Sequence, residues 1–232
     1  MNTPLVLLPG MMCDHRLWRH QLDALGAGRA VSVGDITAAD SIAVLAASVL
    51  SQAPPRFALA GLSMGGIVAF EIWRQAPERV DRLALLDTNF RADAPERQAL
   101  RNEQIARVQA GELADILRDE LKPNYLATIH RANLDLLDEV LAMGLDLGPE
   151  VFVRQSVALR DRADSSATLG SIDCPCLVLC GDEDLLCLPE LHSEMQRMID
   201  GAELLVVPEC GHLSTLEQPQ AVNHALQRWL AE

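Results

Sequence analysis

The segment Gly61-Leu62-Ser63-Met64-Gly65 places a serine in a setting that suits a nucleophile. A serine hydroxyl is weak in this role unless a base takes its proton and nearby N–H groups stabilise the oxyanion. In a tight turn from strand to helix the backbone is strained, and small residues such as Gly61 and Gly65 relieve the crowding. The turn also sets Ser63 at a helix N-terminus, where the dipole favours negative charge. The pattern predicts catalysis by Ser63.

A second oxyanion donor is expected from the loop Leu8-Pro9-Gly10-Met11-Met12, which follows the first apolar run. An acyl-transfer site of this kind needs two N–H groups facing one oxygen. One comes from the residue after the nucleophile and the other from a neighbouring loop. We therefore predict that Met64 and Met11 act as donors through their backbone N–H groups.

The general base is expected from one of six histidines. His212, in the segment Gly211-His212, comes shortly after an apolar run that ends at Val207. Active sites of open parallel sheets gather at the carboxyl ends of strands, so His212 is the candidate that this position favours. The other five, in helical patterns or away from strand ends, are His15, His20, His130, His192 and His224.

Carboxylates that could orient this histidine follow two apolar runs. Gly181-Asp182-Glu183-Asp184 follows one of them, and Asp87 ends another. A carboxylate behind the imidazole holds its tautomer and stabilises the imidazolium. Position along the chain leaves Asp182, Asp184 and Asp87 open.

The elements that must carry these residues alternate between short apolar runs and longer helical patterns. This alternation indicates β-α-β units, and residues 83–86 are apolar at every position, as expected of a strand buried on both faces. We predict an α/β fold with a doubly wound, mostly parallel sheet of about six strands. The predicted strands are residues 5–8, 30–33, 57–59, 80–86, 176–180 and 203–207, and the helices between them are 15–25, 42–50, 64–77, 191–198 and 218–230.

The middle of the chain lacks this alternation. Between residues 90 and 168, charged helix-favouring segments are interrupted by Pro95, Gly111, Pro123 and Gly148-Pro149, with no convincing strand. We expect three or four helices inserted after the fourth strand. The predicted division is a core of residues 1–89 and 169–232 and a helical insertion of residues 90–168.

The composition restricts the partners and the location. The 232 residues fit one domain, and 33 acidic against 19 basic residues give a net charge of −14. This balance argues against nucleic acid and against anionic membrane surfaces. No apolar stretch has the length of a membrane span, and the N-terminus lacks a positively charged n-region. We expect a cytoplasmic protein with neither kind of partner.

The six cysteines are expected to be reduced thiols. Four of them follow the spacing C-x-C-x3-C-x6-C, from Cys174 to Cys187, which differs from the paired C-x2-C knuckles of structural zinc sites. Cys176 and Cys180 fall in an apolar run, where cysteine serves as a small hydrophobic residue. We predict no metal site.

Four landmarks in the same order resemble the α/β-hydrolase superfamily, and the likeness runs nearly end to end. Within it the chain looks like small bacterial carboxylesterases, enol-lactonases and related C–C hydrolases with a helical cap. The resemblance implies a Ser-Asp-His triad, a covalent acyl-enzyme and no cofactor, and it implies that residues 90–168 form a helical cap over the pocket. It places the acid three residues after the glycine, at Asp184. The landmarks are residues 5–10 with Trp18, residues 61–66, residues 181–184 with Pro189, and Gly211-His212.

Two departures from the superfamily pattern stand out. Many relatives have His-Gly in the oxyanion loop where this chain has Pro9-Gly10, which removes a loop contact but not the backbone donor. The chain also enters directly at the strand before that loop, so we expect a minimal sheet that lacks the first strands of the full fold.

The predicted function is hydrolysis of a small-molecule carboxylic ester, lactone or thioester by a serine hydrolase. One alternative is a lyase of the menaquinone pathway, which shares the fold and triad and would use arginines such as Arg91, Arg154 and Arg160 for an acidic substrate. Another is a non-catalytic ligand-binding protein of the same fold. The oligomeric state, a homodimer included, stays open. Side chains that could line an apolar acyl pocket are Met12, Trp18, Met143 and Phe152.

Overall fold

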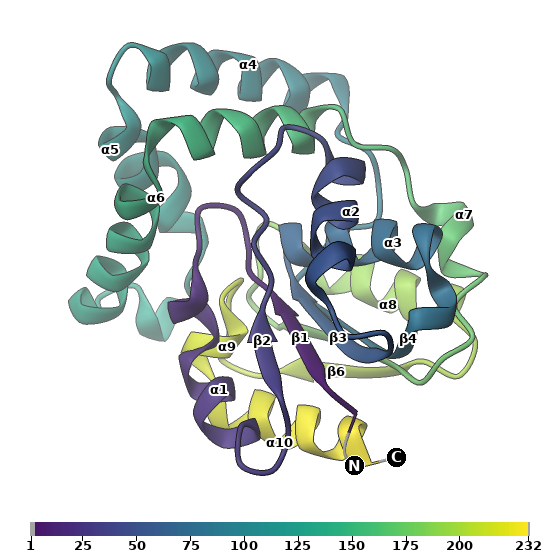
Figure 1. The fold of residues 1–232 in the computed structure, drawn as a ribbon. Helices are drawn as coiled ribbons and strands as arrows, with labels where there is room; N and C mark the ends of the chain where they lie inside the picture. Colours follow the sequence, from purple (N-terminus) through teal and green to yellow (C-terminus); the bar gives the residue numbers. More distant parts are fainter. Residues whose placement is uncertain (1–2, 232) are drawn as a thin grey trace.

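The computed structural model describes residues 3–231, and a six-stranded parallel sheet forms its centre (Figure 1). The strand order is β2-β1-β3-β4-β5-β6, as an α/β-hydrolase fold requires, and the prediction of about six strands is confirmed. The chain changes its direction of travel across the sheet between β1 and β3, and ligands of open α/β sheets bind at such a switch point. The strands are β1 (Leu5–Leu8), β2 (Val31–Val33), β3 (Phe57–Leu62), β4 (Val80–Leu86), β5 (Cys176–Gly181) and β6 (Glu203–Val207).

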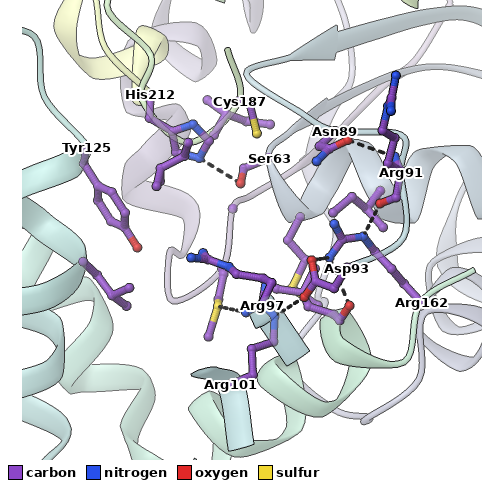
Figure 2. Close-up of a pocket in the computed structure, with 18 of the residues that line it drawn as sticks. Ser63, Asn89, Arg91, Asp93, Arg97, Arg101, Tyr125, Arg162, Cys187 and His212 are labelled. Atoms are coloured by element: carbon purple, nitrogen blue, oxygen red, sulfur yellow. Dashed lines mark hydrogen bonds and ion pairs between the residues drawn. The ribbon is translucent and has the colours of Figure 1, made fainter. Parts of the chain in front are cut away.

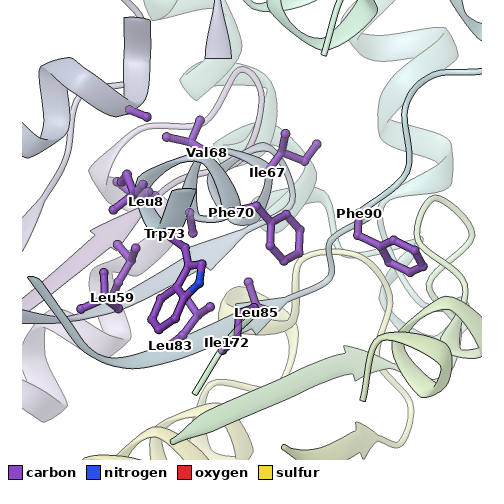
Figure 3. Close-up of a cluster of buried hydrophobic side chains, with 14 of the residues drawn as sticks. Leu8, Leu59, Ile67, Val68, Phe70, Trp73, Leu83, Leu85, Phe90 and Ile172 are labelled. Atoms are coloured by element: carbon purple, nitrogen blue, oxygen red, sulfur yellow. The ribbon is translucent and has the colours of Figure 1, made fainter. Parts of the chain in front are cut away.

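Helices cover both faces of the sheet, because successive strand residues point to opposite sides. Leu83 and Leu85 pack with α2, α3 and α8 in one cluster, part of which Figure 3 shows around Phe70 and Trp73. Ala84 and Leu86 pack on the other side with α1 and α10. These helices are α1 (Arg19–Leu25), α2 (Ile42–Gln52), α3 (Met64–Gln75), α8 (Pro189–Met198) and α10 (Pro219–Ala231), with the short α7 (Ser166–Leu169) and α9 (Ser214–Glu217) and the 3-10 turns η1 (His15–Trp18) and η2 (Pro77–Arg79).

Residues 90–168, which we refer to as the helical insertion, are described by the structure without a strand. In Figure 1 its long helices α4 and α6 lie across the upper edge of the sheet. The long helix α6 breaks where Gly148 adopts a φ of 81°, immediately before Pro149. The elements are α4 (Pro95–Gln109), α5 (Leu113–Asp115), the π-helix η3 (Ile116–Leu121), the 3-10 turns η4 (Lys122–Asn124) and η5 (Thr128–His130), and α6 (Leu134–Arg160).

The structure also bears on the predictions for the cysteines and for membrane spans. All six cysteines are free thiols. Across residues 3–231, no helix combines the length and the apolar character that crossing a bilayer requires.

Candidate active site

Ser63 lies at the sharp turn between β3 and α3, with a φ of 54° and a ψ of −115°. This conformation is strained for a residue with a side chain, and such strain is common where a reactive group must be held exposed. Two glycines make the turn possible. A Cβ on Gly61 would lie 2.4 Å from the carbonyl group of Gly65, and a Cβ on Gly65 would lie 2.2 Å from the Leu8 carbonyl oxygen. The crowding that the motif predicts is present.

Three side chains meet beyond the carboxyl ends of the strands. His212 Nε2 lies 2.9 Å from Ser63 Oγ, and His212 Nδ1 lies 2.8 Å from Asp184 Oδ2. Both are hydrogen-bond distances. Asp184 is 1% exposed and His212 4% exposed. With the Nδ1–H donated to Asp184, Nε2 is free to accept the serine proton.

Of the three candidate acids, Asp184 is the one that contacts the histidine. Asp182 is exposed and accepts a hydrogen bond from a backbone N–H of the loop before His212. Asp87 is fully buried, where its Oδ1 accepts the Gly181 N–H at 3.1 Å. Among the contacts of residues 3–231, neither Asp182 nor Asp87 hydrogen-bonds to His212.

The charge of Asp184 stabilises a positive charge on His212, as the mechanism of a general base requires once it has accepted a proton. Burial alone would lower the pKa of His212, but the charge of Asp184 and the hydrogen bond to it outweigh burial and raise that pKa. Burial would raise the pKa of Asp184, yet His212 and the N–H groups of Cys187 and Leu186 lower it. For Asp87, burial and the nearby charge of Asp184 raise the pKa well above its usual value. The pKa values of the two buried carboxyl groups therefore shift in opposite directions, and the lower pKa belongs to Asp184, the one that contacts His212.

The two predicted oxyanion donors flank Ser63. Met64 opens α3, and Met11 lies in the turn after β1. The turn is close to the serine, since a Cβ on Gly10 would lie 3.5 Å from Ser63 Cβ. In the part of the chain from residue 3 to residue 231, neither the Met11 N–H nor the Met64 N–H is donated to a protein acceptor. Both groups are available to an oxygen beside the serine.

A buried glutamine, not predicted from the sequence, holds the oxyanion loop. Gln155 lies on α6, and its Oε1 accepts the Met12 N–H at 2.8 Å while its Nε2 donates to the Ile36 carbonyl at 3.1 Å. Met12 has a φ of 55°, a conformation that needs such support. One glutamine in an amphipathic helix gives no signal in the sequence that would separate it from a surface residue.

A second layer of hydrogen bonds, also not predicted, supports the Ser63 backbone. Thr88 Oγ1 donates to the Ser63 carbonyl at 2.7 Å, and the Thr88 N–H donates to His192 Nε2 at 3.0 Å. His192 is fully buried, and burial lowers its pKa. It stays neutral and donates its Nδ1–H to the Leu188 carbonyl, so its role is structural.

The loop that carries His212 is tied to the helical insertion. The His212 N–H donates to the Tyr125 carbonyl at 2.7 Å. The Glu217 carboxylate accepts the Ala127 N–H at 2.7 Å and the Gly211 N–H at 3.0 Å. A Cβ on Gly211 would lie 2.5 Å from the Tyr125 carbonyl oxygen. The position of the histidine therefore depends on the insertion as well as on β6.

A cavity of about 450 Å³ opens beside Ser63 (Figure 2). This volume suits a small molecule. None of Met12, Trp18, Met143 and Phe152 lines it, contrary to the predicted pocket, because all four are buried in packing clusters. The lining is more polar than predicted. Its charged members are Arg91, Arg97, Arg101, Arg162 and Asp93.

A lyase with an acidic substrate would need Arg91, Arg154 and Arg160 to face the cavity, and the structure does not place all three there. Of Arg91, Arg154 and Arg160, Arg91 is the one that lines the cavity, and its guanidinium pairs with Glu194. Arg154 donates to a backbone carbonyl of the core, and Arg160 pairs with Asp161. Arg154 and Arg160 are not among the residues that line the cavity.

One group of side chains has the composition of a metal site. The ligand atoms of Asp184, Cys187 and His212 lie within 4.8 Å of one another. Burial raises the pKa of the Cys187 thiol well above its usual value, so the thiol is protonated and a poor ligand. The carboxylate and imidazole are already hydrogen-bonded to each other. This chemistry favours a proton relay over a metal site.

Comparisons with known proteins agree with the fold. The acetyltransferase component (dihydrolipoyllysine-residue) of the acetoin cleaving system of Pseudomonas putida is 29% identical over 250 residues, covering 99% of this chain and 64% of that protein. The chain thus spans less than two thirds of that relative. A thermophilic esterase from Thermogutta terrifontis, solved with malate bound, matches with a TM-score of 0.91 and 28% identity, covering 100% of this chain and 90% of that one.

A second solved structure supports the fold alone. The enol-lactonase from Burkholderia xenovorans LB400 has a TM-score of 0.87 at 23% identity, covering 100% of this chain and 93% of that one. The model of the family described as "Alpha/beta hydrolase family" matches residues 5–225. Since that match spans nearly the whole chain, the protein belongs to the alpha/beta hydrolase family.

Proposed function

We propose that this protein is a serine esterase that hydrolyses a small-molecule carboxylic ester through an acyl-enzyme. The observation that carries the proposal is the position of His212, with one ring nitrogen 2.9 Å from Ser63 Oγ and the other 2.8 Å from Asp184 Oδ2. The similarity to the esterase from Thermogutta terrifontis, at 28% identity, supports the same activity.

The proposed first half-reaction forms the acyl-enzyme. Ser63 Oγ attacks the ester carbonyl carbon while its proton moves to His212 Nε2. The electron pair of the C=O π bond moves to the oxygen, which the N–H groups of Met11 and Met64 stabilise. Asp184 holds the imidazolium. When the carbonyl re-forms, the C–O bond to the alcohol breaks and the alcohol leaves with the proton from His212.

The second half-reaction releases the acid. A water molecule gives one proton to His212 as its oxygen attacks the acyl carbon, and the same two N–H groups stabilise the second oxyanion. Collapse of this intermediate breaks the bond to Ser63 Oγ, which recovers its proton from His212. The enzyme returns to its starting state, and no other reactant is consumed.

In this proposal the helical insertion, residues 90–168, is a cap over a core of residues 1–89 and 169–232. The cavity supports this role, because Arg97 and Arg101 of α4 line it together with Ser63 of the sheet edge. A cap in this place excludes water and shapes the acyl or alcohol site.

The test compares the wild type with Ser63→Ala on p-nitrophenyl butyrate. We expect Ser63→Ala to lower kcat by roughly 10⁶-fold, since the nucleophile and base act as one unit. Ser51→Ala, an exposed serine on α2, is the matched control and should keep full activity. Circular dichroism checks that each variant is folded. Turnover by folded Ser63→Ala at the wild-type rate would overturn the proposal.

Labelling with a fluorophosphonate gives an independent readout. The expected result is one phosphonyl adduct, located by peptide mass spectrometry on Ser63 and absent from Ser63→Ala. An unlabelled wild type would instead support the non-catalytic, ligand-binding alternative.

A further inference from the structure

The charge of the cavity differs in sign from the charge of the protein. The chain has a net charge of −14, yet four arginines and a single carboxylate, Asp93, are the charged groups that line the cavity. Positive groups gathered in a concave site attract anions, and the effect is strongest where the surrounding protein excludes water. The excess of positive charge in the cavity therefore favours negatively charged substrates.

The single carboxylate is already shared. Arg101 Nε lies 2.5 Å from one oxygen of Asp93, and an Arg162 guanidinium nitrogen lies 2.6 Å from the other. These two arginines are buried or nearly so, and each uses the same partner. Arg91 is neutralised from outside by Glu194.

Among the residues that the structure describes, Arg97 is the one of these four arginines that has no acidic partner of its own or shared. It extends from α4 into the cavity, as Figure 2 shows, and it is exposed. Across residues 3–231, no carboxylate or carbonyl pairs with its guanidinium. A planar guanidinium with free N–H groups is suited to hold a carboxylate through two parallel hydrogen bonds.

A second donor lies near it. Tyr125 is buried against the cavity, and in Figure 2 its hydroxyl points toward the end of Arg97. Within the described residues, 3–231, that hydroxyl makes no hydrogen bond. Burial raises the pKa of Tyr125, an effect that the charges of Arg97 and Arg101 only partly oppose, so the phenol keeps its proton as a donor.

We infer that Arg97 and the Tyr125 hydroxyl bind a carboxylate on the substrate, so that the preferred substrates are esters that also carry a free carboxylate. One guanidinium and one phenol match the two oxygens of a carboxylate. The inference rests on the proposed esterase function, and it assigns Arg97 as the residue that determines specificity.

The kinetic test compares monomethyl with dimethyl esters of adipic and suberic acid, with methanol release as the readout. At pH 7.5 the monoester carries one carboxylate and the diester none. The wild type should prefer the monoester. Arg97→Gln should lower the ratio of kcat/KM for the monoester to kcat/KM for the diester by about 10-fold, as expected for the loss of a charged hydrogen bond. Arg97→Lys should restore part of that ratio.

A matched control separates the local charge from the total charge. Arg228→Gln removes one positive charge on α10, at the opposite end of the molecule from α4 (Figure 1), and should leave the ratio unchanged. Raising NaCl from 0.05 to 0.5 M should weaken the preference of the wild type and not that of Arg97→Gln. Diesters cleaved as well as monoesters, or an equal loss on both in Arg97→Gln, would overturn the inference.

A binding measurement distinguishes failure of this inference from failure of the esterase proposal. Monomethyl adipate is titrated into Ser63→Ala and into Ser63→Ala/Arg97→Gln by calorimetry. About 10-fold weaker binding to the double variant supports the carboxylate site even if no ester is turned over. Equal affinity for the two variants rejects the site even if neutral esters are cleaved.

Discussion

The two walls of the cavity differ in how their polar groups are satisfied. On the sheet side, Ser63, His212 and Asp184 each have a fixed partner, and Thr88 holds the carbonyl of Ser63. On the insertion side, the arginines outnumber the carboxylates and Arg97 is left unpaired within residues 3–231. The comparison indicates that the first wall is built for one geometry and the second for a ligand that completes it.

After the loss expected for Ser63→Ala, the largest effect is expected on the sheet side, at the acid. Asp184→Asn should lower kcat/KM by roughly 10³- to 10⁴-fold, because the amide supports the wrong tautomer of His212. Asp182→Asn, two residues away and exposed, is the matched control and should stay within about twofold. Both are assayed on p-nitrophenyl butyrate. An equal loss in the two variants would contradict the assignment of Asp184.

Substituting one glycine on each side tests whether the sheet side tolerates change less well than the insertion side. Gly65→Ala should destabilise the fold by about 3 kcal/mol or more, because its Cβ would meet the backbone oxygen of Leu8 at 2.2 Å and backbone cannot move aside cheaply. Gly144→Ala, on α6, would meet the side-chain end of Leu117 at 2.8 Å, which can rotate, and it gains helix propensity. Its change should stay within about 1 kcal/mol.

Urea unfolding of both variants gives the measurement, with the wild type as reference. The comparison between the walls would fail if Gly144→Ala were as destabilising as Gly65→Ala. If Gly65→Ala remained folded but lost esterase activity, the change would be confined to the turn that holds Ser63. That result would show that the sheet side depends on this turn.

The smallest of these effects is the pH dependence. The base must be neutral to accept the serine proton, and the pKa of His212 is raised by Asp184 despite its burial. Activity should therefore fall as the pH drops through a value above about 6.5, the ordinary histidine pKa. Asp184→Asn should move the acid limb of the residual kcat/KM profile to lower pH, because the charge that raises the pKa is gone. A shift to higher pH would contradict this.

The sheet was predictable because its strands are short runs of apolar residues separated by helical patterns. The one clear extension is β3, which continues to Leu62 where the prediction stopped at residue 59. Gly61 and Leu62 pair with β4 up to the turn at Ser63. A glycine weakens the strand signal, although here the close approach of Gly65 requires it.

The candidate site was predictable only where the signal is local. Ser63, Met64 and Met11 follow from two short segments of sequence, and the acid needed the family resemblance to separate Asp184 from its neighbours. The residues that support the site from distant positions have no local sequence signal. Gln155 lies 143 positions from Met12, and Thr88 lies 25 from Ser63.

The pocket prediction failed for a physical reason. Large apolar side chains pack against one another wherever the fold allows it, so Trp18 and Phe152 went to the core clusters. Other apolar residues line the cavity instead, Met11, Ile67 and Leu159 among them, together with the four arginines and Asp93.

The tie between the His212 loop and the insertion bears on how this enzyme could be re-engineered by exchange of segments. The insertion contributes two main-chain groups there, the Tyr125 carbonyl and the Ala127 N–H, and the core contributes Gly211 and the Glu217 carboxylate. Main-chain groups are supplied by any sequence that follows the same path, but the insertion also places the His130 ring 3.1 Å from the Glu217 carboxylate. A chimaera could therefore replace residues 90–168 with those of a relative and change its substrates, provided that the recipient keeps Gly211 and Glu217 and the new segment keeps a histidine in the place of His130.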